Sequence, residues 1–135
     1  MFCDPLFFIL LVNILALVWA VRSWRKTIQE KWMNNLRDSA ADIIGSSELI
    51  YGLDGNDPAS QLPVAKAEFI AREQKLLLLF REGSSTHSTF KEASEELRSA
   101  AEARQVEPYR KKLNKFSGLV SRRLLEEWEK ISTWY

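Results

Sequence analysis

The sequence contains one cysteine, Cys3, and one histidine, His87, among its 135 residues. A single cysteine cannot form a disulfide within the chain, and no set of His, Cys and carboxylate residues has the spacing of metal ligands. Glycine and proline are also scarce, with five and four residues, and there is no Gly-rich phosphate-binding loop. We therefore expect a helical protein with no metal, no cofactor and no enzymatic activity.

Neither sign of charge is in excess, since 19 Lys and Arg residues stand against 18 Asp and Glu residues. The charges are interspersed along the chain, which differs from the basic patches of nucleic-acid-binding domains. We expect no direct nucleic-acid binding. The carboxylate pairs Glu95-Glu96 and Glu126-Glu127 are predicted on solvent-exposed helix faces. The acidic cluster at residues 54–57 lacks the spacing of a calcium-binding loop and predicts a turn.

The residues from Pro5 to Val21 form an apolar run without a formal charge. As a helix these 17 residues span about 25 Å, which is close to the thickness of a bilayer core. The aromatic residues Phe2, Trp19 and Trp24 lie where interfacial aromatics are expected. A cleaved signal peptide would begin with basic residues, and none precedes Arg22. The run therefore predicts a single transmembrane helix.

The basic residues Arg22, Arg25 and Lys26 follow the run, whereas only Asp4 precedes it. The positive-inside rule then places the N-terminus outside and the C-terminus in the cytoplasm. This topology predicts a transmembrane segment at residues 1–23 of an inner membrane protein and a cytosolic helical domain at residues 24–135.

Asn13 is the one amide in the middle of the apolar run, and Ala16 and Ala20 lie on the same side of the helix. Small residues allow two helices to approach closely, and an Asn amide can form a hydrogen bond between them. A single tolerated Asn is the alternative interpretation. We predict a self-association or pore-lining face that begins at Ile9, continues through these three residues and ends at Trp24.

The chain predicts an all-α fold of about four helices. A helical stripe from Trp24 to Ile43 indicates that the first helix leaves the membrane and continues to Ile44, where Gly45-Ser46-Ser47 ends it. Further helices are predicted from Pro63 to Glu82, from Thr86 or Thr89 to about Arg104, and from Glu107 onward. The third helix has a thin apolar face and is expected at the periphery. The predicted core residues are Trp32, Leu36, Ile43, Leu77, Phe80, Phe116, Leu124 and Trp128.

Arg81 and His87 are separated by five residues. This spacing resembles the Arg-x4–6-His signature of HEPN domains, which are compact helical bundles. In the nuclease members of that family, Arg and His residues from two paired protomers act on RNA. The residue after the arginine is usually Asn, Asp or His in those motifs, and here it is Glu82. Arg81 and His87 are therefore the weak candidates for a catalytic site.

Three stretches carry a second resemblance: residues 31–38 (KWMNNLRD), 75–87 (KLLLLFREGSSTH) and 124–129 (LLEEWE). With the apolar run, they resemble a widespread group of small bacterial proteins that have an N-terminal membrane helix and a helical soluble part. In place of the Asn-Pro that is usual in the group after the Leu-rich run, this chain has Phe80-Arg81-Glu82. The resemblance implies the topology derived above and no activity.

The architecture, one membrane helix followed by a HEPN-like helical part, also resembles the small membrane accessory proteins of RNA-targeting CRISPR systems. That resemblance implies a ring with a pore that supports phage defence. Three hypotheses follow. The protein self-assembles in the membrane as a pore or effector, it is a membrane-tethered HEPN-like ribonuclease, or it is a passive anchor for a cytosolic partner.

Overall fold

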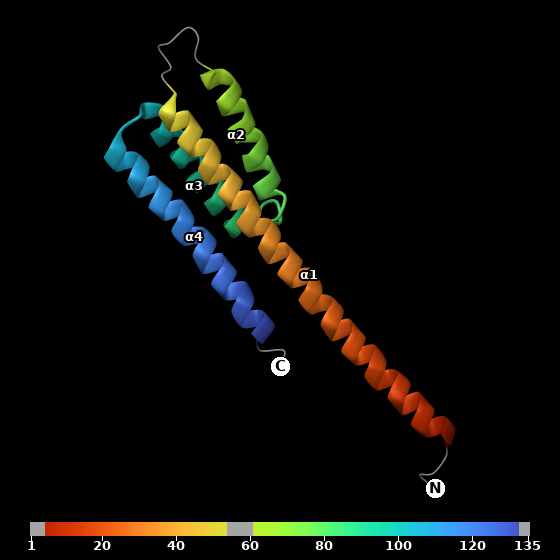
Figure 1. Ribbon diagram of the computed structural model, residues 1–135. Helices are drawn as coiled ribbons and strands as arrows, with labels where there is room; N and C mark the ends of the chain where they lie inside the picture. Colours follow the sequence, from red (N-terminus) through yellow and green to blue (C-terminus); the bar gives the residue numbers. More distant parts are fainter. Residues whose placement is uncertain (1–4, 54–60, 133–135) are drawn as a thin grey trace.

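A computed structural model of the protein describes residues 5–53 and 61–132, which form four α-helices and no strand. The helices are α1 (Pro5–Gly52), α2 (Leu62–Leu77), α3 (Ser85–Ala103) and α4 (Val106–Ser132) (Figure 1). The all-α prediction is confirmed, as is the continuation of the first helix beyond the apolar run. Phe2, Cys3 and the predicted turn at residues 54–57 lie outside the described residues.

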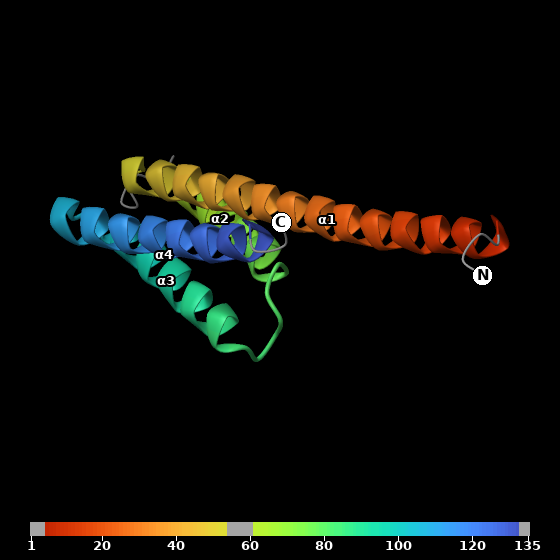
Figure 2. The ribbon, with the colours of Figure 1, turned by 90° about the horizontal axis from the view of Figure 1, so that it is seen from below.

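The helices run alternately up and down, and the second half of α1 packs with α2, α3 and α4 into a bundle (Figure 1). α1 and α3 contact each other, and α2 and α4 lie on either side of that pair. The first half of α1 projects from the bundle as a straight extension (Figure 2). As a result, the α2–α3 connection and the C-terminal end of α4 lie at the end of the bundle from which this extension leaves.

The core of the bundle is built from aromatic and aliphatic side chains of all four helices. Phe80 stacks on Phe90, with 4.6 Å between the ring centroids, and Phe116 meets Phe90 edge to face at 6.4 Å. Leu36 and Phe69 are fully buried against this group. Burial of each such side chain stabilises the fold by roughly 1.5–3 kcal/mol, so the apolar core holds the helices together.

The prediction that Gly45-Ser46-Ser47 ends the first helix is wrong, because α1 continues to Gly52. The hydroxyl of Ser47 donates to the carbonyl of Ile44 and shares a hydrogen bond with the hydroxyl of Tyr109 in α4. The extra turns also bury Ile50 completely. A glycine inside a helix costs about 1 kcal/mol, which is less than the burial of Ile50 contributes.

The boundaries between α2 and α3 also differ from the prediction. α2 ends at Leu77 rather than Glu82, and the connection passes through Gly83 at φ +81°, a conformation that favours glycine. α3 is capped by Ser84, whose hydroxyl accepts a hydrogen bond from the backbone N–H of His87. The predicted cap at Thr89 therefore lies inside the helix. The end of α3 at Arg104, which has left-handed backbone geometry, is confirmed.

Two predictions about the core are wrong. α3 is not peripheral, because it contacts all three other helices and its small buried residues allow them to approach closely. Trp128 is 55% exposed and lies outside the core. The α4 residues that face the bundle near its end are Val120, Glu127 and Ile131, and Trp128 is rotated about 100° away from Glu127.

Candidate functional site

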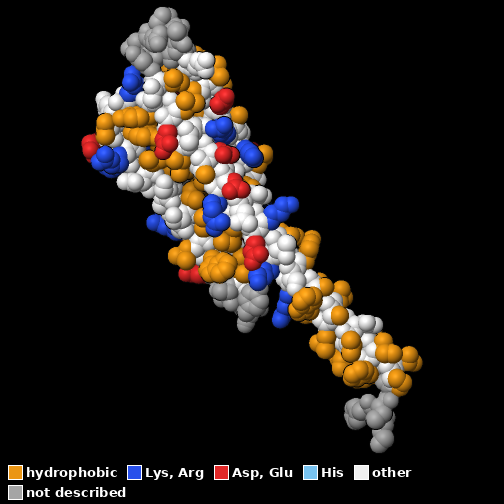
Figure 3. Space-filling view, in the orientation of Figure 1, with side chains coloured by type: hydrophobic (Ala, Val, Ile, Leu, Met, Phe, Trp, Pro, Cys, Tyr) orange, Lys and Arg blue, Asp and Glu red, His pale blue; other side chains and the backbone are white. Residues whose placement is uncertain are grey.

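The first half of α1 is the one described helical segment that is long and apolar enough to cross a membrane, and no part of it is buried. Hydrophobic side chains cover this projection, whereas Lys, Arg, Asp and Glu side chains appear over the bundle (Figure 3). The predicted face, which runs from Ile9 through Asn13, Ala16 and Ala20 to Trp24, is exposed at every position. Within the described residues, nothing packs against it.

The part of this face that contains Asn13, Ala16 and Ala20 lies on the side of α1 away from the bundle, whereas Trp24 at its end borders a cleft beside the bundle. Successive residues of an α-helix are about 100° apart around its axis. The buried residues of α1, from Met33 to Ile50, are centred on the side that faces the other helices. The Asn13, Ala16 and Ala20 positions are centred roughly 150° from them by the same rule. A second span could therefore pack on this face without meeting the bundle of the first chain.

A cleft opens where the projection leaves the bundle, between α1, the α2–α3 connection and the last turns of α4. Its volume is about 610 Å³, which is within the usual range of ligand pockets. Trp24, Ile28 and Trp32 form the wall on α1, and Leu79 lies in the wall opposite. Residues at four-residue steps advance about 40° around a helix. For this reason the stripe that is buried at Leu36 becomes half-buried at Trp32 and exposed at Ile28 and Trp24.

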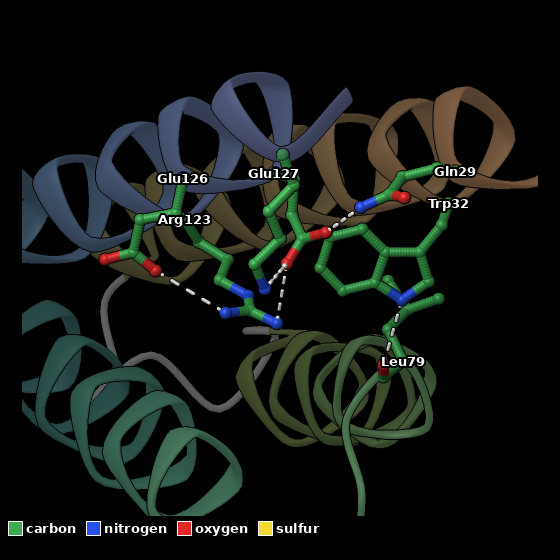
Figure 4. Close-up of polar contacts among 7 residues, drawn as sticks. Gln29, Trp32, Leu79, Arg123, Glu126 and Glu127 are labelled. Carbon is green, nitrogen blue, oxygen red and sulfur yellow. Dashed lines mark hydrogen bonds and ion pairs between the residues drawn. The ribbon is translucent and has the colours of Figure 1, made fainter. Parts of the chain in front are cut away.

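The floor of the cleft is a buried carboxylate, Glu127, which is only 6% exposed. It accepts a hydrogen bond from the side-chain amide of Gln29 and forms ion pairs with Arg123 at 2.9 Å and Lys130 at 3.2 Å (Figure 4). The prediction that Glu126 and Glu127 are both solvated is therefore wrong for Glu127. The contact with Gln29 joins the end of α4 to α1, whereas the two ion pairs lie within α4.

Trp32 and Arg123 complete this network. The indole N–H of Trp32 donates to the carbonyl of Leu79 at 3.0 Å, which holds the α2–α3 connection against α1 (Figure 4). The guanidinium carbon of Arg123 lies 5.5 Å from the centroid of the Trp32 ring, within the range of a cation–π contact. Arg123 also reaches Glu126 at 3.5 Å, while its Nε is buried without a hydrogen-bond partner in the described part of the chain.

The cleft carries more positive than negative charge. Among the residues that the structure describes, Arg25, Arg81 and Arg123 line it, against the single carboxylate of Glu127. Glu127 is already engaged by two cations, whereas the side chains of Arg25 and Arg81 make no hydrogen bond or ion pair with a described residue. The surplus charge can attract an anion.

The two residues of the HEPN-like pattern lie in different surroundings. Arg81 is exposed and lines the cleft, whereas His87 lies in the first turn of α3 and is not part of the cleft lining. Within residues 5–53 and 61–132, no hydrogen bond joins their side chains, and no group of three His, Cys, Asp or Glu residues could hold a metal ion.

Three groups elsewhere in the bundle have shifted pKa values. Burial raises the pKa of Glu73, and a hydrogen bond from Ser94 opposes this shift in part. Burial also raises the pKa of the Tyr109 hydroxyl, which faces Ser47. Hydrogen bonds from Lys115 and Lys112 lower the pKa of Glu96. None of these groups lines the cleft, so their pKa shifts bear on the stability of the bundle and not on the chemistry of the cleft.

Sequence reasoning missed Gln29, Arg123 and Glu127. A signal was present, because Glu127 lies eleven residues after Phe116 and four before Ile131, at a position of the buried stripe of α4. A carboxylate at such a position needs a partner, and that partner, Gln29, is far away in the sequence. Comparisons with protein-family models, with curated proteins and with solved structures gave no match.

Proposed function

We propose that residues 5–21 of α1 span the inner membrane and that the protein self-assembles there without catalytic activity of its own. The observation that carries this proposal is the uncovered apolar half of α1, which continues without a break into a packed bundle. Leu6, Phe8 and Leu17 are each more than 60% exposed. Each such side chain gains roughly 1.5–3 kcal/mol when it leaves water, so a lipid environment favours this segment strongly.

Two other kinds of helix pass the same test of length and composition. The core helix of a soluble protein is covered by its neighbours, and this segment is covered by no described residue. A signal sequence is removed at a cleavage site, whereas here one helix joins the apolar run to the residues that pack the bundle. Both comparisons favour a permanent span.

The bundle is proposed to lie in the cytoplasm. Arg22 and Arg25 are exposed and immediately follow the apolar run, on the side that the positive-inside rule assigns to the cytoplasm. A reporter that works only in the cytoplasm, fused after Tyr135, should therefore be active. Activity of a periplasm-only reporter at the same position would reverse the topology.

Self-assembly is proposed to use the exposed face that contains Asn13, Ala16 and Ala20. Helices in lipid associate by close packing and by polar contacts, and this face offers both. Its position roughly 150° from the bundle-packing side supports the proposal, because several spans could meet with their bundles directed outward. The Asn13 amides would then form a ring, a narrow polar constriction in the middle of the membrane, which would conduct poorly until it opened, as in a gated pore. A pore or membrane effector in phage defence is the finer form of this proposal.

Chemical cross-linking of the full chain in native membranes tests the proposal. We expect a ladder of dimers and larger species, which Asn13→Leu and Ala16→Leu weaken and Leu10→Ala does not. A monomer that is fully extracted with a cytosolic protein would instead identify a passive anchor. RNA cleavage that is lost in the Arg81→Ala/His87→Ala variant would replace the proposal with a HEPN-like ribonuclease.

A further inference from the structure

We propose that the cleft between α1, the α2–α3 connection and α4 binds the headgroup of an anionic phospholipid. The inference rests on the proposed span, because that span sets the depth of the cleft relative to the bilayer. Trp24 lies three residues beyond Val21, or roughly 5 Å, and Trp32 lies eleven residues beyond it, or roughly 16 Å. The headgroup layer is about 5–8 Å thick on each side of the bilayer. The Trp24 end of the cleft therefore lies in this layer, and its Trp32 end lies about 8–11 Å beyond the layer.

The charges of the cleft fit a phosphate diester. The guanidinium groups of Arg25 and Arg81 line it without a partner among the described residues, and Arg123 adds a third guanidinium at the floor. A guanidinium presents several N–H donors in the geometry that phosphate oxygens accept. The one carboxylate, Glu127, is held by Arg123 and Lys130 and does not cancel the outer pair.

Neutral donors lie on the same wall as Arg81. Ser84 and Thr86 line the cleft at the start of α3, whose first turn contains no acidic residue. The hydroxyl oxygen of Ser84 accepts the N–H of His87, which leaves its own proton available to a ligand. The N-terminal end of α3 adds a partial positive charge. These groups act together with the three arginines and reinforce the preference for an anion.

The apolar wall identifies the source of the phosphate as a lipid. Trp24 is 65% exposed and Ile28 is 46% exposed, and both line the cleft on α1, three and seven residues beyond the apolar run. A free phosphate would gain nothing from these side chains, whereas the glycerol and upper acyl carbons of a lipid would cover them. Anionic lipids are also attracted by basic residues that follow a span on its cytoplasmic side.

Native mass spectrometry of the full chain in neutral detergent tests this inference, because detergent removes any effect of topology. The probes are phosphatidylglycerol, phosphatidylcholine and glycerol 3-phosphate. We expect phosphatidylglycerol to bind in preference to the other two. The Arg25→Gln/Arg81→Gln variant breaks no described contact and should bind phosphatidylglycerol about tenfold more weakly. The Arg110→Gln/Lys111→Gln variant loses the same charge at the far end of the bundle and should bind like the wild type.

The outcomes separate this inference from the proposed span. Equal binding of phosphatidylcholine, or an equal loss in the Arg110→Gln/Lys111→Gln variant, would overturn the cleft as a specific site. Binding of glycerol 3-phosphate as tight as that of the lipid would overturn the lipid source. Extraction of the wild type from membranes by alkaline carbonate would overturn the span itself. Retention in the membrane with unchanged lipid binding in the Arg25→Gln/Arg81→Gln variant would overturn only the present inference.

Discussion

The side-chain amide of Gln29 in α1 donates a hydrogen bond to the carboxylate of Glu127 in α4, 98 residues away in the sequence. The contact fixes the register of two antiparallel helices. Because each helix rises about 1.5 Å per residue, Ser132 at the end of α4 lies about level with Trp24 of α1. The bundle therefore ends three residues from the apolar run, and its last turns form the cleft.

The Glu127→Ala variant should lower the free energy of unfolding by about 2 kcal/mol, because it leaves Arg123 and Gln29 without their buried partner. The loss is smaller than for a fully buried pair, since Arg123 is 25% exposed. Denaturant unfolding of the full chain in detergent measures it. The matched control is Glu126→Ala, whose side chain is 50% exposed and whose loss should cost less than about 0.5 kcal/mol. If both variants lose the same free energy of unfolding, the contacts of Glu127 do not hold α4 against α1.

The two tryptophans at the cleft end of the bundle should differ sharply. Trp32→Ala removes the edge contact with Phe80 and the hydrogen bond to Leu79, and should cost about 3 kcal/mol. Trp128→Ala removes a side chain that is 55% exposed and should cost less than about 1 kcal/mol. Thermal unfolding of both variants is the measurement. If Trp128→Ala loses more stability than Trp32→Ala, Trp128 packs in the core as the sequence predicts.

Gly45→Ala should stabilise the protein by about 0.5–1 kcal/mol, because Gly45 lies inside α1 and an added Cβ meets no atom within 4 Å. Gly83→Ala is the contrasting variant. It also meets no atom, but φ at Gly83 is +81°, so the substitution should destabilise by about 1 kcal/mol. Denaturant midpoints of the two variants are compared with the wild type. Destabilisation by Gly45→Ala would indicate that the helix is broken there.

Glu73 should make the stability of the bundle depend on pH. Burial raises its pKa above the ordinary value of 4.5, so the folded state binds this proton more tightly than the unfolded state does. The free energy of unfolding should therefore fall as pH rises from 4.5 through the raised pKa. Glu73→Gln should flatten that slope, whereas Glu68→Gln, at an exposed position of the same helix, should leave it unchanged. Denaturant unfolding at several pH values between 4.5 and neutrality measures the slopes. A slope that persists in Glu73→Gln would assign the pH dependence to another group.

Much of the fold follows from local patterns. The apolar run, the stripe around Phe116 and the glycine at Gly83 indicate helices and a break that the structure contains. The end of α1 could not be predicted in this way, because Gly45-Ser46-Ser47 reads locally as a helix stop. This segment stays helical because Ser47 shares a hydrogen bond with Tyr109 and because Ile50 is buried in the core. Both are tertiary interactions, which a local pattern does not contain.

The cleft was harder to predict than the fold, because its residues come from three separate segments. The sequence assigns Trp24 to a self-association face and Arg81 to a HEPN-like pattern. Neither assignment predicts that the two residues line the same cleft. The sequence predicts a solvated carboxylate at Glu127, because the contacts with Gln29 and Arg123 that surround it exist only in the folded bundle. Steps of four residues along α1 also suggested one continuous stripe, although 40° of rotation at each step carries Trp24 away from the bundle.

The last prediction concerns Asn13. A single span gains no hydrophobic energy by pairing in lipid, so close packing and hydrogen bonds must supply the driving force. Asn13→Leu should weaken self-association by about 0.5–2 kcal/mol, because it removes the amide from the exposed face of α1. Val18→Ala lies on a different side of the helix and should change the association by less than about 0.5 kcal/mol. Energy transfer between labelled full-length chains in lipid vesicles, measured as the protein-to-lipid ratio is varied, gives the association constants. If Asn13→Leu associates as tightly as the wild type while Val18→Ala is weakened, the interface lies on another side of α1 and the ring of amides does not form.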